Sequence, residues 1–144
     1  MFLPRYLADT SALLNLVGTS GSPLRPRDLT LLLSQGRLKI PEAVAREIRK
    51  KDDRLKAWVD RHKPRCVLRA TNENIAELSR ISRDYKQYLG DKVGAGDPIV
   101  ICMATYYSGS WFLALTDDGG IQAVCVLEKI PYVTSSAFCR LEGL

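Results

Sequence analysis

The segment Trp111-Phe112-Leu113-Ala114-Leu115-Thr116-Asp117-Asp118 decides the fold. Its first five residues form an unbroken apolar run, which predicts a short strand buried on both faces. Two aspartates follow almost at once, so we expect their side chains at the carboxyl end of this strand. Fully buried strands of this kind occur in parallel sheets that have helices on both faces.

The rest of the chain alternates between short apolar strands and helices. Further strands are expected at residues 6–8, 38–40 and 131–133. Helices are expected in a longer segment capped by Thr71, from Asp97-Pro98 onward, and at residues 11–17, 26–35, 42–50, 54–62 and 121–127. This order predicts an α/β fold, a three-layer α/β/α sandwich around a central parallel sheet.

Length and composition favour a single domain over residues 1–144, since 46% of the residues are hydrophobic. His62 is the only histidine, and the four cysteines lack C-x-x-C spacing, which argues against a zinc site. Unpaired cysteines are typical of a reducing compartment. The sequence shows no signal peptide and no apolar run long enough to cross a membrane. We therefore expect a cytoplasmic protein.

Positive charge is concentrated in one stretch of the chain. The whole chain carries 21 Lys and Arg against 16 Asp and Glu, a net charge of +5. Residues 46–69 alone hold ten basic and four acidic side chains, so the remainder is near neutral. Arg46, Arg49, Lys50 and Arg54 recur there at helical spacing, which predicts contacts with RNA phosphates. A solvated helix face would show the same pattern.

Five acidic residues fall where an α/β sheet can form a ligand site, near the carboxyl ends of its strands. Asp9 follows the first strand directly, Asp117 and Asp118 follow the strongest strand, and Asp97 precedes an apolar helix. Glu47 lies near the edge of the apolar stripe of the helix after the second strand. Each also has a simpler interpretation. Asp9 and Asp97 suit helix caps, the aspartate pair suits a turn, and Glu47 suits a surface ion pair.

The architecture allows these carboxylates to converge on one point. Several carboxylates a few ångströms apart repel one another strongly unless cations neutralise them. A site made only of oxygen ligands favours Mg²⁺ or Mn²⁺ over zinc or copper. Such ions activate water and stabilise charge on a phosphate, so a nuclease built this way needs no histidine.

Four tracts resemble the PIN-domain ribonucleases, in that family's order and roughly at its spacing. They are Leu7-Ala8-Asp9-Thr10-Ser11-Ala12-Leu13, Pro41-x-x-Val44-x-x-Glu47-Ile48, Gly96-Asp97 with the apolar residues through Ala104, and Leu115-Thr116-Asp117-Asp118. Together they cover nearly the whole chain. The resemblance implies a PIN-like sandwich that binds one or two Mg²⁺ or Mn²⁺ ions and acts as an endoribonuclease.

The resemblance also implies roles for particular residues. The catalytic acids would be Asp9, Glu47, Asp97 and, for the fourth position, Asp117 or Asp118. Of these two we favour Asp118, and all of the acids except Glu47 are candidate metal ligands. The hydroxyls of Ser11 and Thr116 would support the metal site.

Many small single-domain members of that family are VapC-type toxins, each paired with an antitoxin that covers the acidic pocket. The resemblance therefore implies an RNA substrate such as tRNA or rRNA, an antitoxin partner, a homodimer and no membrane association. The tract Asp117-Asp118-x-x-Ile121-Gln122-x-Val124 also resembles ribosome-maturation endonucleases, so RNA processing outside a toxin module stays open.

Two rivals belong to other classes of protein. A phosphatase of the haloacid-dehalogenase type needs a second acid two residues after Asp9, where this chain has Ser11. An inactive α/β binding module, whose acids are all caps and turns, stays open.

Overall fold

The computed structural model describes residues 3–18, 21–90, 98–106 and 112–144. Its described strands form one sheet in the order β3-β2-β1-β4-β5, and every pair in it is parallel. The strands are β1 (Arg5–Ala8), β2 (Leu38–Pro41), β3 (Val67–Leu68), β4 (Phe112–Leu115) and β5 (Tyr132–Val133).

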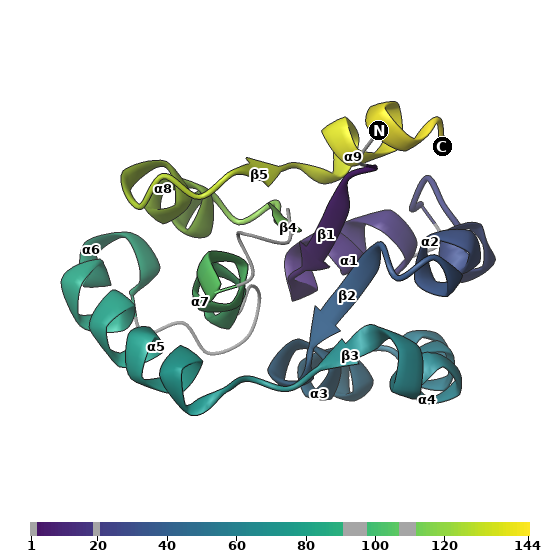
Figure 1. Ribbon diagram of the computed structural model, residues 1–144. Coiled ribbons are helices and arrows are strands. Elements are labelled where there is room, and N and C mark those ends of the chain that lie inside the picture. Colours follow the sequence, from purple (N-terminus) through teal and green to yellow (C-terminus); the bar gives the residue numbers. More distant parts are fainter. Residues whose placement is uncertain (1–2, 19–20, 91–97, 107–111) are drawn as a thin grey trace.

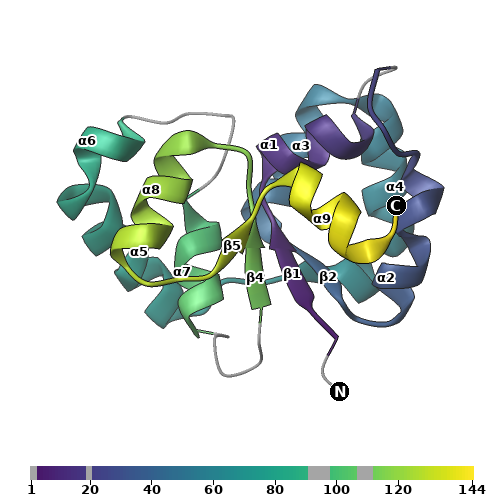
Figure 2. The same ribbon diagram turned by 90° about the horizontal axis from the view of Figure 1, so that it is seen from above.

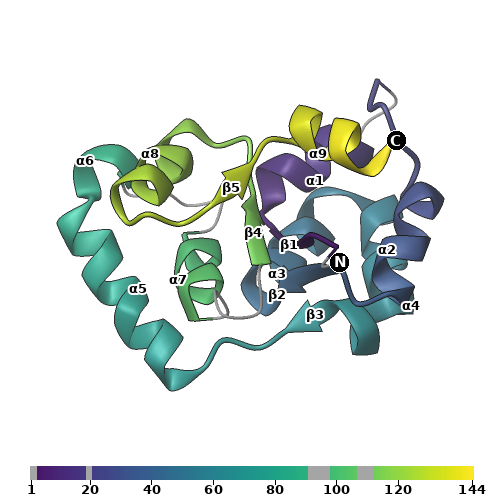
Figure 3. The same ribbon diagram turned by 45° about the horizontal axis from the view of Figure 1, so that its top comes forward.

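Helices cover both faces of this sheet (Figure 1). One face carries α1 (Thr10–Val17), the 3₁₀ helix η1 (Pro26–Leu29), α2 (Thr30–Ser34), α3 (Glu42–Lys51), α4 (Asp53–Cys66) and α9 (Ser135–Glu142). The other face carries α5 (Asn72–Asp84), α6 (Lys86–Leu89), α7 (Ile99–Tyr106) and α8 (Gly119–Leu127). Figure 3 shows the edge strand β5 passing between α8 and α9. The predicted α/β/α sandwich with a parallel sheet is thus confirmed.

The central strand β1 and its neighbour β4 end at the same level of the sheet. It pairs with β2 on one side and with β4 on the other, and Ala8 stands opposite Leu115. Asp9 and Thr116 therefore leave the sheet at the same level from neighbouring strands. In Figure 2, α1 leaves the upper end of β1 and α3 lies beside it. This end of the sheet is called the carboxyl edge below.

The burial of the strands explains why apolar runs in the sequence predicted their positions. Tyr6, Leu7 and Ala8 of β1 are fully buried, as are Ala114 and Leu115 of β4. Strands that are covered on both faces carry apolar side chains at successive positions instead of alternating ones. The described part of α7 is also apolar on all sides, which is what a helix enclosed between α5 and the sheet requires.

Several boundaries differ from the sequence-based predictions. The two-residue strand β3 and the C-terminal helix α9 were not predicted. The helix expected to end at His62 runs on to Cys66, with Pro64 in its last turn, because Cys66 is buried in the core. The long segment capped by Thr71 breaks at Tyr85 into α5 and α6.

Local features fix the packing and the ends of these elements. Trp58 packs in the core, and Gly36 adopts a left-handed conformation just after α2. Thr71 caps α5 by accepting a hydrogen bond from the Asn74 amide at 3.0 Å. Cys102 and Cys125 are buried and form no disulfide. Within the described ranges, no helix has both the length and the apolar character needed to cross a membrane.

Candidate functional site

Asp9 is a charged residue with no exposed surface, placed directly after the central strand. Its Oδ1 accepts hydrogen bonds from Ser11 Oγ at 2.8 Å and from the Ala12 amide at 2.9 Å. Its Oδ2 accepts a hydrogen bond from the Thr116 hydroxyl. Burial raises the pKa of Asp9, and these three hydrogen bonds offset part of that rise. Asp9 is thus the N-cap of α1, as its simpler interpretation predicted, and also a buried carboxylate at the carboxyl edge.

Two hydroxyl groups tie the end of β1 to the end of β4. Thr116 Oγ1 donates to Asp9 and accepts a hydrogen bond from the Asp118 amide at 3.1 Å. Ser11 Oγ donates to Asp9 and accepts a hydrogen bond from the Asp117 amide at 3.2 Å. Each hydroxyl uses both its donor and its acceptor capacity, so the two loops hold each other in place.

Asp118 lies close enough to Asp9 for the two charges to interact. Their repulsion adds to the rise in the pKa of Asp9, after burial. Asp118 is also the N-cap of α8, because its Oδ1 accepts a hydrogen bond from the Ile121 amide at 2.9 Å. This position suits a carboxylate, because the N-terminus of a helix interacts favourably with negative charge.

Asp117, in contrast, is fully engaged in holding helices together. Its Oδ1 accepts from the Ser135 amide at 2.8 Å, and its Oδ2 accepts from the Ser135 hydroxyl at 2.6 Å and from Asn15 Nδ2 at 2.7 Å. Burial raises the pKa of Asp117, but these hydrogen bonds outweigh it and the net shift is downward. Asp117 therefore joins α1 to α9. This geometry supports Asp118 as the acid that faces Asp9.

The sequence analysis did not identify Asn15 and Ser135, the two partners of Asp117. Ser135 follows the edge strand β5 just as the aspartates follow β4, and that position was the available signal. Asn15 is an exposed polar residue of α1 and carried no signal in the sequence.

Gly120 brings α8 against α6 beside the candidate site. A Cβ at this position would lie 2.2 Å from the carbonyl oxygen of Tyr88 and 3.3 Å from Asp118 Oδ1. Only a residue without a side chain fits there. The close contact fixes the first turn of α8, which Asp118 caps.

The structure places Glu47 apart from the Asp9–Asp118 pair. Glu47 Oε1 lies 3.2 Å from Lys51 Nζ one helical turn away, which is the ion pair of the simpler interpretation. The same oxygen is buried and accepts no hydrogen bond of normal geometry from the described residues. Asp97, the remaining predicted acid, lies outside the described residues.

The four predicted RNA-binding cations have different surroundings. Arg46 is exposed and pairs loosely with Glu42, at 3.4 Å, while Arg49 Nε lies 3.1 Å from Asp60 Oδ1. Lys50 is exposed on α3. Arg54 donates a hydrogen bond to the backbone oxygen of Val17 and so fastens α4 to the end of α1. Arg54 therefore has a structural contact that the sequence pattern did not predict.

The described carboxylates are the type of ligand that a hard divalent cation prefers, but they are fewer than such a site needs. The described residues contain no group of three or more His, Cys, Asp or Glu side chains that could share a metal ion. Asp9 and Asp118 supply oxygen ligands, and their mutual repulsion would be relieved by a cation between them. Burial and the nearby Asp9 raise the pKa of the Cys125 thiol to about 12, and a protonated thiol is a poor metal ligand.

The fold and site define an α/β/α sandwich protein with a pair of carboxylates, one of them buried, at the carboxyl edge of its parallel sheet. The chain belongs to the family described as "Domain of unknown function (DUF4411)", which matches residues 27–142. The matched range includes Glu47, Asp97 and Asp118 and begins after Asp9. No curated protein matches the chain.

Proposed function

We propose that this protein is an endoribonuclease that depends on Mg²⁺ or Mn²⁺ and hydrolyses phosphodiester bonds at the carboxyl edge of the sheet. The observation that carries the proposal is the electrostatic repulsion between Asp9 and Asp118. These two carboxylates follow neighbouring parallel strands, and Asp9 is wholly buried. Desolvation and repulsion make such a pair costly unless a cation or a proton compensates.

Asp9, Asp97 and Asp118 would hold the metal, one or two ions in all, and Glu47 would be a further catalytic acid. Asp9 and Asp118 are the members of that ligand set that the structure describes. Divalent ions in such sites supply an activated water and stabilise charge on the phosphate and the leaving oxygen. Ser11 and Thr116 orient Asp9 through hydrogen bonds to both of its oxygens. The basic residues of α3 and α4 raise the local concentration of RNA.

We further propose that the protein is the toxin of a toxin–antitoxin pair, acts on tRNA or rRNA, and forms a homodimer. These proposals rest on the resemblance to small PIN-domain toxins. Growth arrest on induction of the wild-type gene, absent for Asp9→Asn, would support the toxin. Wild-type expression without growth arrest would favour RNA processing.

We propose that the protein is cytoplasmic because none of its four cysteines forms a disulfide and three of them are buried. Free thiols persist in a reducing compartment. Fractionation of cells that express the chain tests this proposal.

The decisive experiment compares RNA cleavage by the wild-type protein and two charge-neutral variants, Asp9→Asn and Asp118→Asn. Both substitutions keep a side chain that can cap a helix, so the fold is preserved while the charge is lost. Labelled tRNA and rRNA fragments are incubated with Mg²⁺, with Mn²⁺ and with EDTA. The proposal expects metal-dependent cleavage by the wild type and none by either variant.

Asp52→Asn is the matched control. Asp52 caps α4 with a 2.9 Å hydrogen bond from the Leu55 amide, so it undergoes the same chemical change at a helix N-cap away from the carboxyl edge. It should cut RNA like the wild type. Equal cleavage by wild type, Asp9→Asn and Asp118→Asn would overturn the proposal and favour a binding module.

A further inference from the structure

Two hollows on the surface adjoin and form one groove, called the composite groove below. They share Glu42, Arg46 and Arg69. The apolar end has a volume of about 420 Å³ and is otherwise lined by Pro41, Ala43, Ala70, Ile75, Leu78, Ile99 and Met103. The basic end has a volume of about 580 Å³ and adds Arg49, Lys63, Pro64 and Val67.

The composite groove lies at the same edge of the sheet as the candidate site. Glu42 follows directly on β2, and β2 pairs with β1, whose end carries Asp9. Ile99, the first residue of α7, comes two positions after Asp97 and lines the apolar end. Neighbouring strands are about 4.8 Å apart, so the groove begins within a few residues of Asp9.

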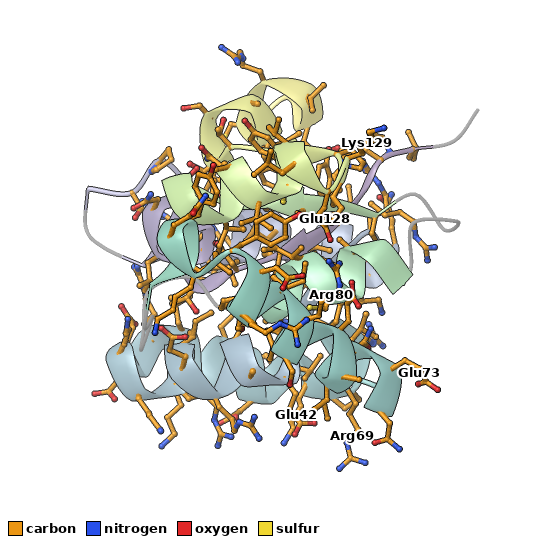
Figure 4. The ribbon with its side chains drawn as sticks, turned by 90° about the vertical axis from the view of Figure 1, so that its left-hand side faces the viewer. Glu42, Arg69, Glu73, Arg80, Glu128 and Lys129 are labelled. Carbon is orange, nitrogen blue, oxygen red and sulfur yellow. The ribbon has the colours of Figure 1, made fainter. Side chains whose placement is uncertain are left out.

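An acidic side chain bridges two arginines where the two ends meet. Glu42 Oε1 lies 3.4 Å from Arg46 Nη1, and Glu42 Oε2 lies 3.2 Å from Arg69 Nε. Figure 4 shows Glu42 and Arg69 side by side at the lower edge of the molecule. Arg69 is 89% exposed and Arg46 65% exposed, so solvent screens both pairs and they exchange readily for other partners.

We propose that the composite groove binds one unpaired nucleotide of an RNA strand, with its base in the apolar end and the adjoining phosphates at the basic end. This inference rests on the proposed function, because it names the part of the RNA that the nuclease holds. It goes beyond Arg46, Arg49, Lys50 and Arg54 by adding Lys63, Arg69 and an apolar surface for the base.

Charge and shape together favour this occupant. The basic end offers Arg46, Arg49, Lys63 and Arg69 from three different segments of the chain against the single carboxylate of Glu42. Phosphates bind such a cluster, while the apolar end takes a group that leaves water readily. A nucleotide presents both chemistries within one unit.

The base must be unpaired to reach the apolar end. Bases of a double helix are stacked and paired, so their faces are not accessible, whereas looped or single-stranded bases can turn outward. The apolar end is lined by aliphatic side chains and methionine, which cover a base face without reading its hydrogen-bonding edge. We therefore expect preference for single-stranded segments and little preference among the bases.

Fluorescence anisotropy in EDTA tests the proposal without cleavage. The probes are a labelled ten-nucleotide single-stranded RNA and the duplex of the same sequence. Arg69→Gln should weaken binding of the single strand and lower the slope of log affinity against log salt by about 0.7, the value for one phosphate contact. Ile75→Glu places a charge in the apolar end from a half-exposed position and should weaken binding about tenfold.

Glu42→Gln should strengthen the binding of single-stranded RNA, whereas the other two substitutions weaken it. It removes the carboxylate that competes for Arg46 and Arg69, so single-stranded RNA should bind about threefold more tightly. A merely structural role for Glu42 would weaken binding or leave it unchanged.

Arg83→Gln on α5 and Leu31→Glu on α2 are the matched controls, since both side chains are exposed outside the groove. Circular dichroism confirms that each variant is folded. The proposal is overturned if Arg69→Gln and Ile75→Glu bind like their controls, or if the duplex binds as tightly as the single strand. Tighter binding of a labelled poly-glutamate peptide than of RNA would also overturn it and assign the groove to an acidic protein. EDTA prevents metal-dependent cleavage, so the binding measurement does not depend on nuclease activity. It can therefore be interpreted even if the cleavage assay fails.

Discussion

The carboxyl edge at β1 and β4 and the composite groove beside β2 use charge in opposite ways. At the first, Asp9 is wholly buried, both of its oxygens accept hydrogen bonds, and two hydroxyls are shared between loops. At the second, exposed arginines share one glutamate at 3.2–3.4 Å. A buried polar network of this kind fixes geometry, whereas exposed ion pairs are weak and exchangeable. The rigid carboxyl edge is therefore suited to a catalytic site, and the exposed composite groove is suited to a binding site.

The largest expected effect follows from neutralising Asp9. Asp9→Asn should lower the cleavage rate more than 100-fold, because loss of an outer partner of a metal ligand alone costs about 10- to 100-fold. Its free energy of unfolding should stay the same or rise, since burial of a charged carboxylate is unfavourable. Single-turnover cleavage and urea unfolding measure the two quantities. Loss of both activity and stability would mean that Asp9 serves the fold alone.

Removal of one shared hydroxyl should destabilise the fold measurably. Thr116→Val keeps the shape but leaves the Asp118 amide without its hydrogen-bond acceptor and removes the donor to Asp9 Oδ2. We expect a loss of about 1–3 kcal/mol in the free energy of unfolding. Urea denaturation measures it, and a change below 0.5 kcal/mol, roughly the level of surface substitutions, would contradict a rigid network here.

An intermediate case is the contact between the ends of α5 and α8, where Arg80 and Tyr85 both donate hydrogen bonds to Glu128. Figure 4 shows Arg80 and Glu128 close together. These bonds lower the pKa of Glu128 below its ordinary value of 4.5. Its stabilising contribution is therefore present above pH 4.5 and is lost as the pH falls through the lowered pKa. Wild type and Glu128→Gln should differ by less than about 1 kcal/mol at pH 7 and converge in acid. A difference in unfolding free energy that is independent of pH would refute this.

The smallest effect is expected at the exposed groove. Arg46→Gln should change the free energy of unfolding by less than about 0.5 kcal/mol, because its pair with Glu42 is solvent-exposed. Its affinity for single-stranded RNA should fall nonetheless. Thermal unfolding and anisotropy on the same preparation measure both. A large loss of stability would show that the groove, like the carboxyl edge, is a structural network.

The sequence predicted the sandwich, the strand ends and the position of Asp9 and Asp118, because apolar runs locate buried strands and parallel strands end at one edge. It favoured Asp118 over Asp117 by position alone and gave no physical reason for the choice. That distinction depends on Ser135 and Asn15, which are 18 and 102 residues away from Asp117 in the chain. The strand β3 was missed because two residues carry no periodicity. The role of Arg54 was missed because its partner is a backbone oxygen.

The contact at Gly120 offers a marker for comparing related sequences. Since any side chain there would collide with the Tyr88 carbonyl oxygen, α6 and the start of α8 can touch only in chains with glycine at this position. A homologue with a larger residue must move α6 outward or displace the turn that Asp118 caps. We therefore expect glycine at this position to vary together with the aspartate two places before it, so that sequence alignments alone can sort relatives with an intact carboxylate pair from those without one.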